Sequence, residues 1–241
     1  MRTLIFDIET IGEDWNGFDE ATKDSLTHWI DRVARSDEEK EVLLDDLKNC
    51  LGLSPLTGTI VAIGVYDLEL HQGVVYYSGG EEADFEIEDF VFKTRTEKEM
   101  LEDFWEGAKS YDTFVTFNGR RFDAPFLSIR STKYDIRPSQ NLMEGRYLYQ
   151  QKAVRHIDLQ EQMTFYGATQ KRPPLHLFCR AFGIKSSKEE GISGEHIAEL
   201  FRMKKFRDIA EYNARDVTAT TKLYKKWLKN LAPDSFIEKF K

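Results

Sequence analysis

The sequence predicts an α/β fold in which a mixed sheet is flanked by helices. Three apolar segments come first, at residues 2–9, 59–66 and 72–77, and the short link 67–71 favours a hairpin between the last two. Helical and strand patterns then alternate from residue 96 to 158, and helices follow. We therefore expect three antiparallel strands followed by parallel ones.

Residues 13–55 differ from the strands on either side, because they are acidic and have helical spacing. Two apolar stripes repeat along them: Leu26, Trp29, Ile30 and Val33, then Val42, Leu43, Leu47 and Leu51. Ser36 and Glu39 form a capping-box pattern before the second stripe, which Gly52 and Pro55 end. We expect a helical insertion, whose role as a substrate lid, a partner surface or padding is left open.

The remaining elements follow from capping and apolar spacing. A polar stretch at 79–89 is expected to be a loop before a short strand at 90–92. Thr96 and Glu99 open a helix, 113–117 is a strand, and Asp123 starts the helix 122–134. The strand 155–158 leads into a helix capped by Asp158. Further helices are expected at 175–182, 194–201 and 206–231.

Length and composition indicate an ordinary globular protein. The 241 residues, 41% hydrophobic and 32% charged, suit one domain spanning 1–241. No membrane span or signal segment is evident, so we expect a cytoplasmic protein. Cys50 and Cys179 are expected to be free, buried thiols. The net charge of −8 argues against binding of long duplexes by charge alone, but not against an enzyme that acts on a nucleic acid end.

The first strand carries two carboxylates. Asp7 and Glu9 are two residues apart in an otherwise apolar run, so they point to the same face of the strand. Two like charges on a core strand repel and resist desolvation, and a bound cation would turn them into a site. The alternative is an edge strand that ends in a solvated acidic loop.

Two further carboxylates stand at positions that also have a structural explanation. Asp123 follows an apolar strand and the turn residue Gly119, although it could be only a helix N-cap. Asp216 lies four residues after Tyr212, within the stripe of the last helix that should face the sheet. A buried ion pair with an arginine is the alternative for Asp216.

Together these carboxylates predict a metal site. Asp7, Glu9, Asp123 and Asp216 can face one spot at one end of the sheet, where they would repel one another without cations. Four carboxylates can hold two divalent metals in the arrangement used for phosphodiester cleavage. Oxygen ligands favour Mg²⁺ or Mn²⁺ over zinc.

Three motifs carry a resemblance to a known family. The segments D-I-E-T at 7–10, N-G-R-R-F-D at 118–123 and Y-N-A-R-D at 212–216 resemble the exonuclease motifs of the DEDD superfamily, in its tyrosine branch. Leu53-Ser54-Pro55, the segments at 156–159 and 191–195, and the insertion resemble stand-alone exonucleases related to the proofreading domain of family B DNA polymerases. This resemblance implies a ribonuclease H-like fold and a metal-dependent 3′→5′ exonuclease that releases nucleoside monophosphates.

The resemblance also implies roles for individual residues. Asp7 would be shared by two metals, with Glu9 and Asp216 completing one site and Asp123 supporting the other. Tyr212 would orient or help to deprotonate the attacking water, although a packed aromatic is the alternative.

Contacts with the substrate are expected around the same motifs. Asn118 and Phe122 would contact the terminal nucleotide, and Thr10 and Ile11 the last base, although Phe122 is equally explained as a core residue. Single-stranded DNA ends are the expected substrate, and a role in DNA repair would fit. By contrast, Arg120 and Arg121 are expected to be solvated, and His156 to be a packed or surface residue.

Three other functions compete with a DNA exonuclease. An exoribonuclease would use the same chemistry, because no residue can be assigned to a 2′-hydroxyl. A non-catalytic binding or scaffold module would keep the fold alone, which the intact set of carboxylates disfavours. An endonuclease of this general fold is disfavoured by the tyrosine motif. Pathway, oligomeric state, processivity and protein partners stay open.

Overall fold

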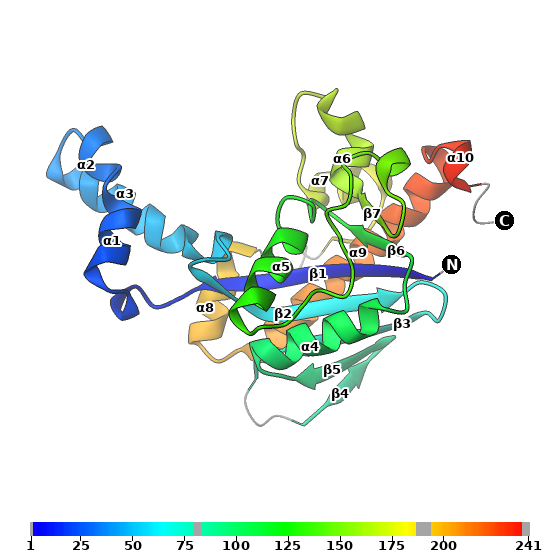
Figure 1. The fold of residues 1–241 in the computed structure, drawn as a ribbon, viewed down its shortest axis with the longest axis horizontal. Helices are drawn as coiled ribbons and strands as arrows, with labels where there is room; N and C mark the ends of the chain where they lie inside the picture. Colours follow the sequence, from blue (N-terminus) through cyan, green and yellow to red (C-terminus); the bar gives the residue numbers. More distant parts are fainter. Residues whose placement is uncertain (1, 80–82, 187–193, 238–241) are drawn as a thin grey trace.

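The computed structural model describes residues 2–79, 83–186 and 194–237. Within them, a seven-stranded mixed sheet has the order β4-β5-β3-β2-β1-β6-β7 (Figure 1). The strands are β1 (Thr3–Gly12), β2 (Gly58–Asp67), β3 (Gln72–Tyr77), β4 (Phe85–Ile87), β5 (Phe90–Thr94), β6 (Thr113–Thr116) and β7 (Arg155–Asp158).

The sheet confirms the predicted topology and adds one strand. β1, β2 and β3 are antiparallel neighbours, and β6 and β7 continue the sheet parallel to β1. The expectation of a loop throughout 79–89 is wrong, because β4 pairs with β5 there. The Phe85 and Phe92 rings stack at 4.5 Å across that pair, which stabilises a strand too short to show an alternating pattern.

Helices cover both faces of the sheet and also extend to one side of it. The α-helices are α1 (Glu20–Thr27), α2 (Ile30–Val33), α3 (Asp37–Cys50), α4 (Glu97–Ala108), α5 (Asp123–Lys133), α6 (Leu159–Met163), α7 (Leu175–Phe182), α8 (Ile197–Arg202), α9 (Phe206–Asn230) and α10 (Asp234–Ile237). Short 3-10 turns are η1 (Trp15–Gly17), η2 (Leu51–Leu53), η3 (Leu148–Gln150), η4 (Phe165–Gly167) and η6 (Gly194–His196). Both side-chain and backbone bonds of the Thr96–Glu99 capping box are present, and Gly183 ends α7 at a φ of +66°.

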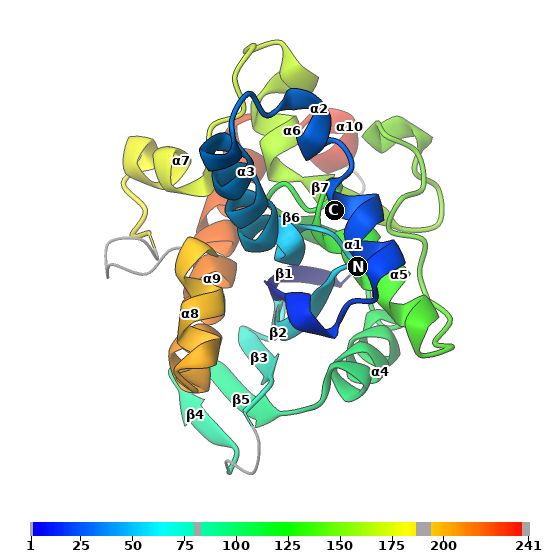
Figure 2. The same ribbon diagram turned by 90° about the vertical axis from the view of Figure 1, so that its left-hand side faces the viewer.

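Alternation along β1 divides the core into two layers. Leu4, Phe6 and Ile8 pack with α4 and α5 on one face of the sheet. Ile5 packs on the other face, beneath α9. Figure 2 shows the sheet between these two helical layers. Ile5, Asp7 and Glu9 are alternate residues of β1 and point to the same face of the sheet, so both carboxylates lie on the α9 side.

The insertion of α1, α2 and α3 forms an arm beside the sheet (Figure 1). The predicted stripes are only partly buried there: Ile30 and Leu51 are buried, whereas α3 has no buried residue and Val42 is 60% exposed. The first stripe is also divided between two helices, because α1 ends at Thr27 and α2 begins at Ile30. The Ser25 and Thr27 hydroxyls in the last turn of α1 donate to backbone carbonyl oxygens of the same helix. The Thr10 hydroxyl donates to the Gly52 carbonyl oxygen at 2.7 Å and joins the end of the arm to β1.

Both cysteines are free, as expected, but only Cys179 is buried. The prediction that Cys50 is buried is wrong, because it ends α3 on the exposed arm. Residues 191–193 of the segment 191–195 lie outside the described part of the chain. Among the described residues, no helix has both the length and the apolar character needed to cross a membrane.

Candidate active site

Asp7 and Glu9 project from the middle of β1 toward α9. Their antiparallel partners on β2 are Gly64 and Ala62, so small residues lie beside both carboxylates. The register of β1 and β2 shifts between Glu9 and Thr10, directly after the acidic pair. The local strand geometry therefore leaves room above the sheet for side chains from α9.

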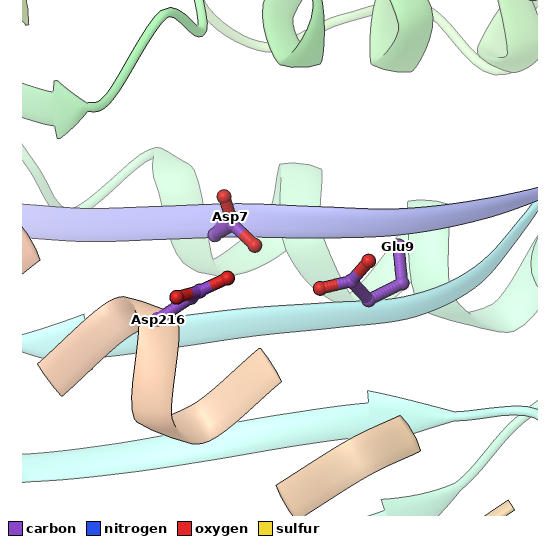
Figure 3. A group of neighbouring side chains, drawn as sticks. All are labelled: Asp7, Glu9 and Asp216. Atoms are coloured by element: carbon purple, nitrogen blue, oxygen red, sulfur yellow. The ribbon is translucent and has the colours of Figure 1, made fainter. Parts of the chain in front are cut away.

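Asp216 approaches this pair from α9. Asp7, Glu9 and Asp216 each offer a carboxylate oxygen, and these three oxygens lie within 4.8 Å of one another. Figure 3 shows the two β1 carboxylates and the Asp216 carboxylate converging from strand and helix. Three oxygen ligands at this separation could hold a divalent cation.

Asp123 lies beside this group, at the first residue of α5. Its Oδ1 accepts a hydrogen bond from the Ile8 backbone amide at 3.0 Å, and the residue is only 3% exposed. The interpretation of Asp123 as the N-cap is wrong, because Phe122 occupies that position and makes no side-chain cap. The carboxylate instead joins the start of α5 to β1, between Asp7 and Glu9.

Burial and mutual repulsion dominate the electrostatics of the site. Burial is the largest cause that raises the pKa of Asp7 well above its ordinary value, and the charges of Asp123, Glu9 and Asp216 raise it further. Burial and then the charge of Asp216 do the same to the pKa of Glu9. Burial raises the pKa of Asp123 to about 7 against two opposing backbone hydrogen bonds. The carboxylates therefore favour bound protons or cations.

Asn213 is a residue of the site that sequence reasoning missed. Its Nδ2 donates to Asp7 Oδ2 at 2.9 Å, and its amide also lowers the pKa of Glu9 through a hydrogen bond. The side chain is fully buried, and its Oδ1 accepts no hydrogen bond from the described residues. A polar amide four residues after Ile209 and four before Val217, both in the buried stripe of α9, was the available signal.

Gly64 makes room for this amide. A Cβ atom at position 64 would lie 2.1 Å from Asn213 Oδ1, and the amide is held in its orientation by the donor contact with Asp7. Rotating it would turn an oxygen toward a carboxylate. A glycine is therefore required directly opposite Asp7 in the β1–β2 register.

The other predicted residues take different positions around the carboxylates. Tyr212 belongs to α9 and is buried in the core on the α9 side of the sheet. Ile11 is partly buried and packs against the same core. Thr10 is half-buried, and its hydroxyl is already bonded to the arm. Phe122 is half-buried with its ring 5.3 Å from that of Phe126.

Asn118 lies in a loop that Asp158 holds in place. Asn118 adopts the left-handed conformation, with φ +64°. The Asp158 carboxylate accepts hydrogen bonds from the Asn118 and Arg120 amides at 2.9 and 3.0 Å, and it also caps α6 as predicted. The side chain of Asn118 is half-buried.

Arg120 and His156 are structural parts of this region. Arg120 is buried, so the expectation of a solvated side chain is wrong; its guanidinium donates to the carbonyl oxygens of Leu142 and Gly145. His156 is buried, which agrees with the expectation of a packed residue and not with that of a surface residue. Burial lowers its pKa to about 3.

The fold and the acidic cluster define a ribonuclease H-like α/β domain related to nucleases. Residues 59–236 match the model of a family described as a predicted 3′-5′ exonuclease related to the exonuclease domain of PolB. The chain belongs to this family. The matched range includes Asp123, Tyr212 and Asp216, while Asp7 and Glu9 precede it.

Solved structures confirm the fold. The family B DNA polymerase from the hyperthermophilic archaeon Pyrobaculum calidifontis is similar over 94% of this chain, with a TM-score of 0.58 and 18% identity. The similarity covers 24% of the polymerase chain, so the chain spans about a quarter of that protein. A comparison with curated proteins found no match.

Proposed function

We propose that this protein is a metal-dependent 3′→5′ exonuclease that hydrolyses phosphodiester bonds at the 3′ end of single-stranded DNA and releases nucleoside monophosphates. The convergence of three carboxylate oxygens within 4.8 Å, from β1 and α9, is the observation that carries the proposal. The family to which the chain belongs supports the same chemistry.

The residues at the site fit divalent cations. Asp7, Glu9 and Asp216 would hold a first Mg²⁺ or Mn²⁺, and Asp123 would assist Asp7 with a second. Their repulsion and burial, which raise the pKa values of Asp7 and Glu9, would be relieved by positive charge. When bound, two such cations would activate water and stabilise the leaving oxygen.

Residues of the chain would position the substrate around this centre. Tyr212 would orient the attacking water from α9, four residues before Asp216. Asn118 and Phe122, both half-buried in the segment that leads from β6 to α5, would contact the terminal nucleotide. Thr10 and Ile11 would border the last base where β1 leaves the acidic pair.

Labelled single-stranded DNA tests the proposal in the presence of Mg²⁺ or Mn²⁺. We expect stepwise shortening from the 3′ end, lost in Asp7→Ala and Asp216→Ala proteins that remain folded. Faster shortening of an RNA of the same sequence would reassign the substrate. No hydrolysis of either polymer by pure wild-type protein would refute the catalytic function and favour a binding module.

A further inference from the structure

A hollow of about 480 Å³ lies outside the acidic site, between η3, β7, α6 and α10. These elements lie together near the β7 edge of the sheet (Figure 1, Figure 2). Its lining includes four aromatic residues, one arginine and one amide: Tyr147, Tyr149, Tyr166, Phe236, Arg155 and Gln162. We refer to these six residues as the aromatic patch.

Three of the aromatic rings form an open platform. The Tyr147 and Tyr149 rings are parallel, with centroids 5.7 Å apart and an interplanar angle of 5°. Tyr166 meets Tyr147 edge to face at 4.7 Å. Tyr149 is 82% exposed, so one face of the stack is open to a planar ligand. Tyr147 and Tyr166 are half-buried next to it, and an exposed ring that packs on other aromatic rings is typical of binding surfaces.

Guanidinium groups accompany these rings. Arg155 lies 5.4 Å from the ring centroid of Phe236, and Arg146 lies 6.0 Å from those of Tyr147 and Tyr166. Glu161 lies 3.3 Å from Arg146 and offsets part of this charge. Rings for stacking beside guanidinium groups suit bases joined by phosphates, whereas a proline-rich peptide would need the rings alone.

The turn that carries Tyr166 is strained. Phe165 and Tyr166 adopt φ values of +50° and +55°, and Gly167 follows at +98°. Non-glycine residues adopt this conformation only where surrounding contacts impose it. Here Gln162 Nε2 donates to the Tyr166 hydroxyl at 2.7 Å and keeps the ring at the hollow.

A network of contacts joins the aromatic patch to the loop of Asn118. Asp158 binds the amides of that loop, and Arg120 binds the carbonyl oxygen of Gly145 at 2.7 Å, directly before Arg146. Arg155 and Asp158 are the two ends of β7, about 10 Å apart at the usual rise of a strand. Arg155 pairs with Thr113, and Thr113 pairs with Thr3, four residues before Asp7 on β1. The backbone of Arg155 is therefore about 16 Å from that of Asp7 at the usual strand rise and spacing, a distance that a few nucleotides span.

We propose that the aromatic patch binds the single-stranded part of the substrate, 5′ to the nucleotide at the acidic site. Bases stack on Tyr149 and Tyr166, and Arg155 faces the phosphates. The placement of the patch on the 5′ side of the bound nucleic acid rests on the proposed function, which puts the 3′ end at the carboxylates. Stacking supplies most of the affinity, because Glu161 offsets the charge of Arg146.

Binding without turnover tests this proposal. The full chain with Asp7→Ala is titrated in EDTA against 5′-fluorescein-labelled oligothymidylates of three and twenty nucleotides, with fluorescence anisotropy as the readout. Adding Tyr149→Ala should weaken binding of the 20-mer about 5- to 100-fold and leave the trimer unchanged. Tyr149→Phe keeps the ring and should restore the affinity, and Trp29→Ala on the arm is a control for loss of an exposed aromatic residue.

The outcomes separate the patch from the catalytic proposal. Unchanged 20-mer binding after Tyr149→Ala, equal effects on both lengths, or no binding by the Asp7→Ala parent would overturn the patch. Tyr149-dependent binding by a wild-type protein that hydrolyses nothing with Mg²⁺ or Mn²⁺ would keep the patch and refute the exonuclease. Binding of a proline-rich peptide in place of the 20-mer would also overturn it.

Discussion

Substituting Gly64 with alanine perturbs the site without touching a carboxylate. The new Cβ would lie 2.1 Å from Asn213 Oδ1 and 3.0 Å from Val217 Cγ2, so the first contact must widen by about 1 Å. Asn213 is fully buried and bonded to Asp7, and it cannot move into solvent. Either α9 shifts outward or the amide leaves Asp7.

The two routes have comparable costs. Overpacking a core costs about 1–3 kcal/mol, and losing a buried hydrogen bond to a charged group costs about 1.5–3 kcal/mol. We expect Gly64→Ala to lower the free energy of unfolding in EDTA by about 1.5–3 kcal/mol. Because the amide positions Asp7, we also expect about tenfold weaker Mn²⁺ binding, the scale seen when outer-shell partners of metal ligands are removed.

A double-mutant cycle separates this contact from general damage. Urea unfolding and Mn²⁺ calorimetry are measured for the parent, Gly64→Ala, Asn213→Ala and the double variant. Removing Oδ1 first should reduce the cost of Gly64→Ala to below about 1 kcal/mol, leaving only the Val217 contact. Gly107→Ala is the matched control, since an added Cβ there meets nothing within 4 Å. Additive effects, or a Gly64→Ala protein as stable as the parent, would refute the reasoning.

Further predictions concern charge. In EDTA, urea unfolding should show stability falling as pH rises from 6.5 to 8.5. The pKa of Asp123 is about 7 in the folded protein and near 4 in the unfolded chain. The stability that its bound proton contributes is therefore complete below about pH 4 and is lost as the pH rises through about 7. The lowered pKa of His156 makes stability rise with pH only below its unfolded pKa of 6.5. Stability that rises between pH 6.5 and 8.5 would therefore contradict the raised pKa of Asp123. Asp216→Asn should raise stability at pH 8 in EDTA by about 1 kcal/mol while abolishing digestion of labelled DNA, and a lower melting temperature would indicate a structural carboxylate. Arg130 Nη2 lies 2.7 Å from Glu97 Oε2, and both side chains are buried. Glu97→Ala removes this partner of the buried guanidinium and should lower the free energy of unfolding in urea by about 3–5 kcal/mol. A cost below about 1 kcal/mol would show that the pair is dispensable.

The sheet and its principal helices could be predicted because their signals are local. Thr96 and Glu99 form a capping box within one turn, and Gly183 supplies the left-handed residue after α7. The hairpin of β2 and β3 follows from two apolar runs and a short link. β4 could not be predicted in this way, because Phe85 gains its stability from Phe92 across the sheet rather than from its own neighbours.

The arm shows where helical patterns fail. Its stripes have the spacing of a buried helix face, but spacing does not reveal whether a sheet surface is available to cover it. In the structure β1 is flanked by β2 and β6, and α9 with α4 and α5 already cover the sheet. Val42 is left exposed for this reason, as is Cys50 at the end of α3.

The acidic site was predictable through its charges and not through the groups that stabilise them. Asp7 and Glu9 break an apolar strand, and that conflict is visible in sequence. The groups that offset their repulsion are inconspicuous: an amide on α9, the missing side chain of Gly64, and small residues on β2. Each is required only because α9 crosses this part of the sheet, which is a property of the assembled fold.

The same reasoning explains why the carboxylates are informative as a set. A single buried aspartate can be neutralised by a proton or by one hydrogen bond, as Asp123 is helped by the Ile8 amide. Asp7, Glu9 and Asp216 crowd their oxygens within 4.8 Å, and one amide cannot offset three charges. In a fold built for stability alone at least one of these carboxylates would be a liability, so their combined presence on two elements far apart in sequence supports the proposal that the site binds a cation.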